Sequence, residues 1–262
     1  MPVIPSPVDG IDLRYDVTGA GSPVVLLHGS VLSRAIWRGL GYLAPLAAEH
    51  RVIRVDLRGH GRSGKPDDPA AYTQDAFVAD LIAVLDAEGI DRAALVGYSL
   101  GARVALTAAL RHPERVTRLV SLGGSAAAQH GAVDQVFYPG VIDSVREHGM
   151  EEFCAEQGLG PEVTSRRGAA TRAAFLAADP AAMAALLAAT DATPAIPEED
   201  LCALAVPSLW MAGGDDHPRC EESRESAAVI PGARFVELPG RTHGGTLSPA
   251  EPVLAEVLPF LR

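Results

Sequence analysis

Short apolar runs alternate with longer segments of helical periodicity along most of this chain. Most of these runs are almost continuously apolar, as expected for strands that helices cover on both faces. A further segment, Ile11–Val17, alternates apolar and polar residues and predicts an antiparallel strand at the sheet edge. The alternation of strands and helices predicts an α/β fold with a mostly parallel sheet. The clearest strand candidates are Val24–Leu27, Val52–Asp56, Ala94–Val96, Leu119–Leu122, Ser208–Ala212 and Arg234–Leu238.

Two amphipathic segments show the helical pattern most clearly. In Thr73–Glu88 the large apolar residues recur at helical spacing, and Thr73 is a suitable N-cap. Ser248–Leu261 carries its apolar residues on one helical face in the same way. Proline lacks an amide proton, so Pro259 is expected to distort or end this helix near its tail.

The segment 126–200 interrupts the alternation of strands and helices. It contains no convincing strand, but it has alanine-rich helical stretches at Ala169–Ala178 and Pro180–Thr190. We interpret it as helices inserted between two strands, forming a cap over one end of the sheet. A single domain is then expected, with a core of residues 1–125 and 201–262 and a cap of residues 126–200.

Composition and charge narrow the classes of function. A chain of 262 residues with 48% hydrophobic and 21% charged residues can bury a sizeable core. The net charge of -11 disfavours nucleic acids and anionic membranes as partners. The opening residues lack the basic start and apolar run of a signal peptide, and no apolar stretch is long enough for a membrane span. We therefore expect a cytoplasmic protein that acts on a small molecule.

Three cysteines are present, and none form a C-x-x-C pair. An odd number without that spacing predicts small buried or half-buried thiols in a reducing compartment. The cysteines are Cys154, Cys202 and Cys220.

The segment Gly97-Tyr98-Ser99-Leu100-Gly101 fits the pattern G-x-S-x-G. It follows the apolar run Ala94–Val96 and precedes a helix-forming run, Ala102–Arg111. A sharp strand-to-helix turn strains the central serine and requires glycine where side chains would collide. The turn also places the hydroxyl at a helix N-terminus, where the dipole favours developing negative charge. A helix-capping serine is the alternative, but this order of elements predicts that Ser99 is a nucleophile.

The motif and its surroundings resemble the α/β-hydrolase family over almost the whole chain. The resemblance rests also on the segments 26–30 (Leu-Leu-His-Gly-Ser) and 56–63 (Asp-Leu-Arg-Gly-His-Gly-Arg-Ser), and on a late acid and histidine. It implies an eight-stranded, mostly parallel sheet flanked by helices, with a helical cap inserted after the sixth strand. It further implies an oxyanion hole formed by the backbone amides of Ser30 and Leu100.

The acid and the base are assigned by their order along the chain. The strand at Ser208–Ala212 runs into Asp215 and Asp216, and the family pattern G-x-x-D selects Asp216. Asp215 remains an alternative by register. His243 follows the last strand and reproduces the family order of serine, acid and histidine.

The remaining histidines and the glycine-rich segment receive other interpretations. His28 is interpreted as structural, and so are three residues of the segment 56–63. The structural residues of that segment are Arg58, His60 and Arg62. Of the other histidines, His50 precedes a strand, His112 ends a helix and His217 directly follows Asp216, while His130 and His148 lie in the cap.

These residues imply a serine hydrolase that cleaves an ester, lactone or thioester through an acyl-serine intermediate. A small to medium, largely apolar substrate is expected, because the candidate pocket walls are apolar. No cofactor or metal is expected, and either a monomer or a homodimer fits. The candidate pocket residues are Leu32, Trp37, Phe137 and Tyr138, with Phe153, Phe175 and Leu186 as further options.

Other activities are known on this fold, so three alternatives stay open. They are a C–C bond hydrolase, a non-hydrolytic lyase or cyclase, and a ligand-binding receptor. Retention of nucleophile, acid, base and oxyanion loop favours an enzyme over a receptor.

Overall fold

A computed structural model describes residues 2–262. It contains one eight-stranded sheet with the strand order β1-β2-β4-β3-β5-β6-β7-β8. β1 and β2 pair antiparallel, as do β2 and β4, and all other neighbours are parallel. The strands are β1 (Val3–Pro5), β2 (Asp12–Thr18), β3 (Ser22–Leu27), β4 (His50–Asp56), β5 (Ala93–Tyr98), β6 (Val116–Leu122), β7 (Ser208–Gly213) and β8 (Arg234–Leu238).

The six predicted parallel strands are present, most of them longer by one to three residues than the apolar runs suggested. The predicted antiparallel strand is also present, as β2. It is not at the edge of the sheet, because the short strand β1 pairs with its outer side. A three-residue strand that ends in Pro5 offers too little pattern to be predicted.

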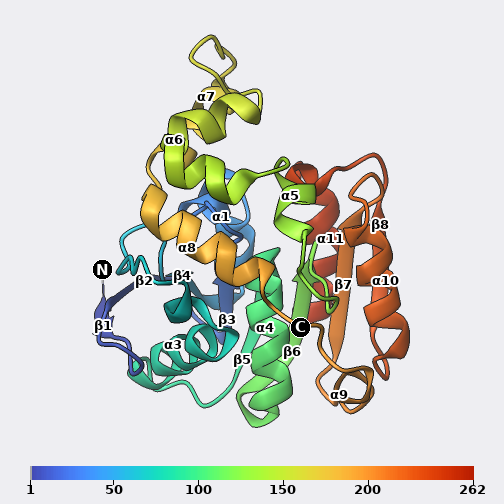
Figure 1. The fold of residues 1–262 in the computed structure, drawn as a ribbon. Coiled ribbons are helices and arrows are strands. Elements are labelled where there is room, and N and C mark those ends of the chain that lie inside the picture. Colours follow the sequence, from blue (N-terminus) through green and yellow to red (C-terminus); the bar gives the residue numbers. More distant parts are fainter. Residues whose placement is uncertain (1) are drawn as a thin grey trace.

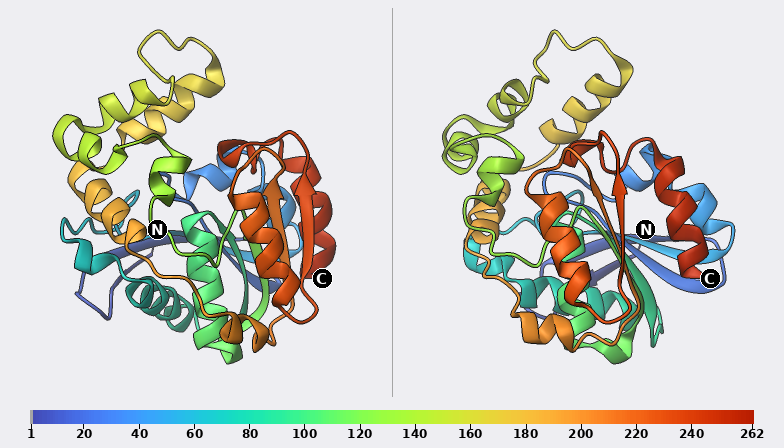
Figure 2. Two further views of the ribbon diagram at one scale, coloured as in Figure 1. Left: turned by 45° about the vertical axis from the view of Figure 1, so that its right-hand side comes forward. Right: turned by 90° about the vertical axis from the view of Figure 1, so that its right-hand side faces the viewer.

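Helices cover both faces of the sheet, as Figures 1 and 2 show. Successive residues of β3 point to opposite faces, so that Val25 and Leu27 join one core cluster and Val24 and Leu26 the other. The first cluster is completed by α3 (Gln74–Ala87), α4 (Leu100–Arg111) and α10 (Arg219–Val229). The second is completed by α1 (Ala35–Gly39), α2 (Leu43–Ala47) and α11 (Ala250–Leu261).

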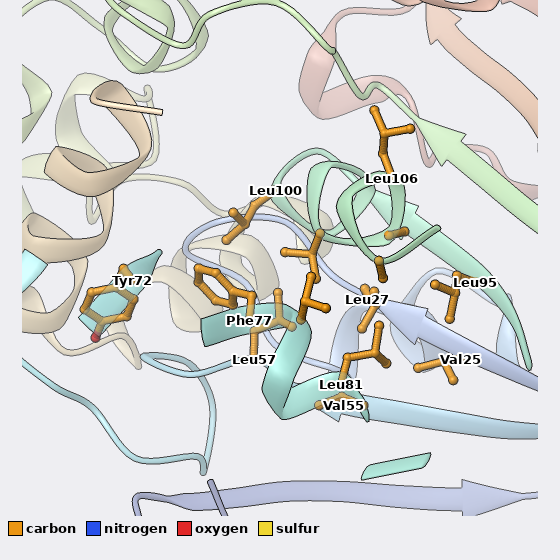
Figure 3. Packing of buried hydrophobic residues seen from close by; sticks show 14 of the residues in the cluster. Val25, Leu27, Val55, Leu57, Tyr72, Phe77, Leu81, Leu95, Leu100 and Leu106 are labelled. Carbon is orange, nitrogen blue, oxygen red and sulfur yellow. The ribbon is translucent and has the colours of Figure 1, made fainter. Parts of the chain in front are cut away.

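The first cluster lies directly beneath the turn that follows β5. Figure 3 shows Phe77 and Leu81 of α3 beside Leu27 of β3, with Leu100 at the start of α4 close by. All four side chains are at most 5% exposed. This packing fixes the start of α4 against β3, and burying such side chains stabilises the fold by about 1.5–3 kcal/mol each.

Helix boundaries agree with the sequence where capping residues mark them. Thr73 caps α3 by accepting a hydrogen bond from the Ala76 amide at 3.2 Å. Pro259 lies inside α11, which continues for two more residues to Leu261. The short 3₁₀ helices are η1 (Pro69–Tyr72), η2 (Pro113–Arg115) and η3 (His243–Gly245).

Five helices and no strand connect β6 to β7 in the described chain. In Figure 1 α6 and α7 lie beyond one end of the sheet, and α8 runs from them back towards the core. α6 has a kink at Gly149, whose φ is 74°. The inserted helices are α5 (Ala132–Val136), α6 (Val141–Glu156), α7 (Arg166–Leu176), α8 (Pro180–Asp191) and α9 (Glu198–Cys202).

None of the helices within residues 2–262 is by itself long and apolar enough to cross a membrane. Only α7 and α8 taken together pass that test, and they are bent by 89° relative to each other. Cys154 and Cys220 are buried, whereas Cys202 is exposed at the end of the short helix α9, against the expectation of a buried or half-buried thiol.

Candidate active site

Ser99 occupies the sharp turn between β5 and α4. Its φ of 53° and ψ of -116° place it in a region that side chains rarely adopt, and its amide donates to the Leu122 carbonyl at 2.9 Å. A Cβ at Gly97 would lie 2.2 Å from the Gly101 carbonyl oxygen, and one at Gly101 would lie 2.2 Å from the Leu27 carbonyl oxygen. Both glycines of the motif are therefore required by the close approach of β3, β5 and α4.

A chain of two hydrogen bonds connects Ser99 to the late histidine and acid. His243, at the start of η3, places Nε2 at 2.9 Å from the Ser99 Oγ and Nδ1 at 2.8 Å from an Asp216 carboxylate oxygen. A carboxylate accepts the Nδ1 proton, which leaves Nε2 free to accept the proton of the serine hydroxyl. The Asp216 side chain is only 4% exposed, so the carboxylate and the imidazole meet away from water.

The structure separates the two neighbouring acids. Asp216 is buried and faces His243, whereas Asp215 is exposed and its amide donates to the Arg241 carbonyl at 3.0 Å. His217 also turns outward and pairs with Glu221 at 2.7 Å. The geometry therefore brings Asp216, not Asp215 or His217, into the hydrogen-bonded chain.

Tyr98 supports the histidine, which the sequence analysis did not predict. Its ring stacks on His243 with centroids 5.4 Å apart, and its hydroxyl donates to the His243 carbonyl at 2.9 Å. Burial raises the pKa of Tyr98 above its usual range, so the hydroxyl remains a donor at neutral pH. Its place directly before Ser99 was the only sequence signal for this role.

Ser30 and Leu100 line the same cavity as Ser99. Neither of their backbone amides donates a hydrogen bond to another group within residues 2–262. The first amides of a helix lack partners in that helix, and Leu100 is the first residue of α4. Two free donors beside a hydroxyl form an arrangement that can bind a developing oxyanion.

Two buried histidines hold the loop that carries Ser30. The Val31 amide donates to His60 Nε2 at 3.2 Å, and the Leu57 amide donates to His28 Nε2 at 3.1 Å. Both rings use Nδ1–H as a donor to backbone carbonyls, and they meet edge to face at 4.9 Å. Burial lowers the pKa of His60 to about 4 and that of His28 well below its ordinary value. The two residues are neutral and structural, in agreement with the sequence interpretation.

The arginines of the glycine-rich segment also have structural contacts. Arg58 is completely buried and forms a bidentate ion pair with Asp80 at 2.8 and 3.0 Å. The Arg62 amide donates to the Asp56 carboxylate at 3.0 Å, which closes the turn after β4. Neither residue lines the cavity beside Ser99.

That cavity has a volume of about 50 Å³ and lies between the carboxyl ends of the strands and the inserted helix α5. Apolar side chains of α5 and Phe137 form one wall. The lining also includes the polar residues Arg103, Gln129 and Arg219.

The expected pocket walls are corrected for three residues. Trp37 is completely buried on the other face of the sheet, where its ring meets Tyr42 edge to face at 5.4 Å. Leu32 packs against the same cluster. Tyr138 packs on Phe153 and its hydroxyl lies 3.1 Å from the Ser144 hydroxyl.

Only Phe137 of the four expected residues borders the cavity. The further options Phe153, Phe175 and Leu186 pack in or against the first core cluster. In the part of the chain that the structure describes, no group of three or more His, Cys, Asp or Glu residues is placed to hold a metal ion.

Comparison with known proteins agrees with the fold. Residues 22–145 match the family model of the alpha/beta hydrolase fold. The pimeloyl-[acyl-carrier protein] methyl ester esterase of Edwardsiella ictaluri is 32% identical over 95% of this chain and 96% of its own. The 2-hydroxymuconate semialdehyde hydrolase of Pseudomonas sp. (strain CF600) is 42% identical, but over 45% of this chain and 42% of its own.

The enol-lactonase of Burkholderia xenovorans LB400 is similar in structure. Its TM-score is 0.83 at 27% identity, over 99% of each chain. The full-length match to the esterase, together with the sheet order and the turn at Ser99, assigns the family. The chain belongs to the α/β-hydrolase fold family.

Proposed function

We propose that this hydrolase cleaves an ester, lactone or thioester through an acyl-serine intermediate. The observation that carries the proposal is the hydrogen-bonded chain from Ser99 through His243 to the buried Asp216, at 2.9 and 2.8 Å. Each group has the type and position that nucleophile, general base and orienting acid require.

In the first half of the reaction, His243 removes the Ser99 proton as Oγ attacks the acyl carbonyl. The negative charge on the carbonyl oxygen is stabilised by the amides of Ser30 and Leu100. His243 then returns the proton to the departing oxygen or sulfur, and the acyl group remains on Ser99. In the second half, His243 activates water, which releases the acid and restores the serine.

The inserted helices are proposed to act as a cap. α5 contributes apolar side chains to the cavity wall, and Phe137 follows it directly. These contacts favour a small to medium, largely apolar acyl or leaving group. The esterase and the lactonase named above, both similar over nearly their full lengths, support this choice of bond.

A C–C bond hydrolase is the second candidate. It is favoured by the 42% identity to the 2-hydroxymuconate semialdehyde hydrolase, although this similarity covers less than half of either chain. Such an enzyme would share the Ser99–His243–Asp216 arrangement and would differ in its substrate.

Hydrolysis of 4-nitrophenyl acetate tests the proposal. Wild type is expected to release nitrophenol with turnover and to transfer ¹⁸O from labelled water to acetate. Ser99→Ala is expected to lose at least 10³-fold in kcat, with only the rate due to binding and the oxyanion hole remaining. The control Ser33→Ala removes a hydroxyl that accepts a hydrogen bond from the Ala35 amide and does not line the cavity beside Ser99, so it should keep wild-type activity. A Ser99→Ala variant with undiminished turnover would contradict the proposal.

A further inference from the structure

Two buried arginines border the cavity beside Ser99. Arg103 is 6% exposed and Arg219 is 4% exposed, and both line this cavity. The lining contains no aspartate or glutamate among the described residues. Buried charges in proteins are normally paired, so two arginines at one small cavity call for an explanation.

Arg103 lies one helical turn after the reacting serine and lines the same cavity. It lies four residues after Ser99 on α4, and its amide donates to the Ser99 carbonyl at 3.1 Å. Residues four apart share one face of a helix and stand about 6 Å apart along its axis. Helical side chains lean towards the N-terminus, which directs the Arg103 side chain back towards the Ser99 end.

The partners of Arg103 are all neutral. Its guanidinium donates to the carbonyls of Ser125 at 2.9 Å and Ala127 at 3.1 Å, and also to that of Pro194. The Nε atom is buried and has no hydrogen-bond partner within residues 2–262. No carboxylate of that part of the chain lies within ion-pair distance of Arg103.

Arg219 does not supply the missing negative charge. Its guanidinium pairs with Glu222, three residues later on α10. Glu222 pairs with Arg219 and Asp216 pairs with His243, so neither of these carboxylates pairs with Arg103. Desolvation, together with the charge of Arg219, lowers the pKa of Arg103 to about 10. Arg103 therefore stays protonated at neutral pH.

We infer that Arg103, with Arg219 beside it, binds a carboxylate of the substrate. The preferred substrate is then an ester, lactone or thioester with a free carboxylate a few atoms from the scissile carbonyl. The inference rests on the proposed function for the reaction at Ser99. A guanidinium recognises carboxylates through paired donors, and the substrate carboxylate supplies the ion-pair partner that Arg103 lacks in the described chain.

Two esters of equal size test the inference. Monomethyl glutarate carries a carboxylate, and methyl glutaramate carries a neutral amide in its place. Wild type is expected to prefer the carboxylate ester at least tenfold in kcat/KM. Arg103→Met should lose this preference at least tenfold, and Arg103→Lys should keep part of it. Arg146→Met, a control at an exposed arginine of α6, should leave the preference unchanged.

The ratio of the two kcat/KM values does not depend on the fraction of folded enzyme. It therefore remains informative if Arg103→Met is less stable because three carbonyls lose their donor. The inference would be overturned if Arg103→Met lost activity equally on both esters, or if wild type showed no preference. Arg103 would then have only a structural role, in fixing the loops that connect the inserted helices to the core.

Binding to Ser99→Ala separates this inference from the proposed function. Calorimetry should show monomethyl glutarate bound at least tenfold more tightly than methyl glutaramate, and the difference should vanish in Ser99→Ala/Arg103→Met. If this binding difference is found but wild type hydrolyses neither ester, the carboxylate site is supported and the proposed ester hydrolysis is contradicted. If wild type hydrolyses neutral esters but binding shows no preference for the carboxylate, ester hydrolysis is supported and the carboxylate site is contradicted.

Discussion

The serine at residue 99 combines a strained backbone with a complete set of hydrogen-bond partners. Its positive φ is imposed by the contacts at Gly97 and Gly101, where no side chain fits. Strain of this kind costs about 1–3 kcal/mol and persists only where the surrounding structure fixes it. Here it lifts Oγ from the end of β5 towards the His243 imidazole.

The two adjacent acids differ sharply in their expected contribution to catalysis. Asp216→Asn should lower kcat about 10⁴-fold, because an amide no longer favours the imidazole form with its proton on Nδ1. Asp215→Asn is the matched control, since its side chain is exposed and outside the hydrogen-bonded chain. Steady-state hydrolysis of 4-nitrophenyl acetate measures both. A larger loss of kcat in Asp215→Asn than in Asp216→Asn would show that Asp215, and not Asp216, orients His243.

Chain order, the G-x-S-x-G motif and the resemblance to the family predicted the residues that the structure brings together at the site, with Asp215 left open beside Asp216. Ser99, Asp216 and His243 each follow a strand whose carboxyl end reaches the same edge of the sheet. The partners of these residues were not predictable in the same way. The stacking of Tyr98 on His243 and the neutral surroundings of Arg103 arise from contacts between distant segments.

At the scale of elements, the strands were predicted better than the helices. Buried parallel strands read as apolar runs, whereas α10 is rich in charged residues and α1 and α2 have only five residues each. The inserted helices were predicted as a region, but only two of the five individually. Their apolar side chains pack on one another, so the sequence could not show which of them reach the cavity.

Trp37 and Phe137 were both expected to line the pocket, but they lie in different parts of the fold and have different roles. Trp37→Ala on α1 should reduce the free energy of unfolding by about 3–5 kcal/mol, because it empties a fully buried site. Its kcat/KM per folded molecule should stay within about threefold of wild type. Phe137→Ala should instead alter KM, since this residue borders the cavity. Urea unfolding and ester kinetics of both variants measure the contrast, and the opposite pattern would contradict the placement of Trp37.

At the scale of the whole molecule, the carboxyl ends of six parallel strands meet at one edge of the sheet, and α6 and α7 lie beyond that end. The loops after β3 and β4 are joined there by the neutral histidines His28 and His60. The stability of the fold is therefore linked to the protonation of these two buried rings.

We expect the free energy of unfolding to fall as the pH is lowered from about 6.5 to about 4. In this range the unfolded chain binds a proton at residue 60 and the folded chain does not, because burial lowers the pKa of His60 from 6.5 to about 4. This residue contributes about 3 kcal/mol of stability that is present above pH 6.5 and lost towards pH 4. Urea unfolding at several pH values measures the slope.

His60→Gln keeps a polar side chain without a group that titrates in this range. Its stability should depend less steeply on pH between 4 and 6.5 than that of wild type. An equal slope in the variant would show that His60 is not the linked group.

Labelling with a fluorophosphonate tests the central claim, an activated serine at residue 99, most directly. Intact mass should show one phosphonyl group on wild type and none on Ser99→Ala, with His243→Ala labelled at least 10³-fold more slowly. Folding of each variant is checked by circular dichroism. Folded wild type that stays unlabelled while it also fails to hydrolyse 4-nitrophenyl acetate would contradict the account, as would stoichiometric labelling of Ser99→Ala.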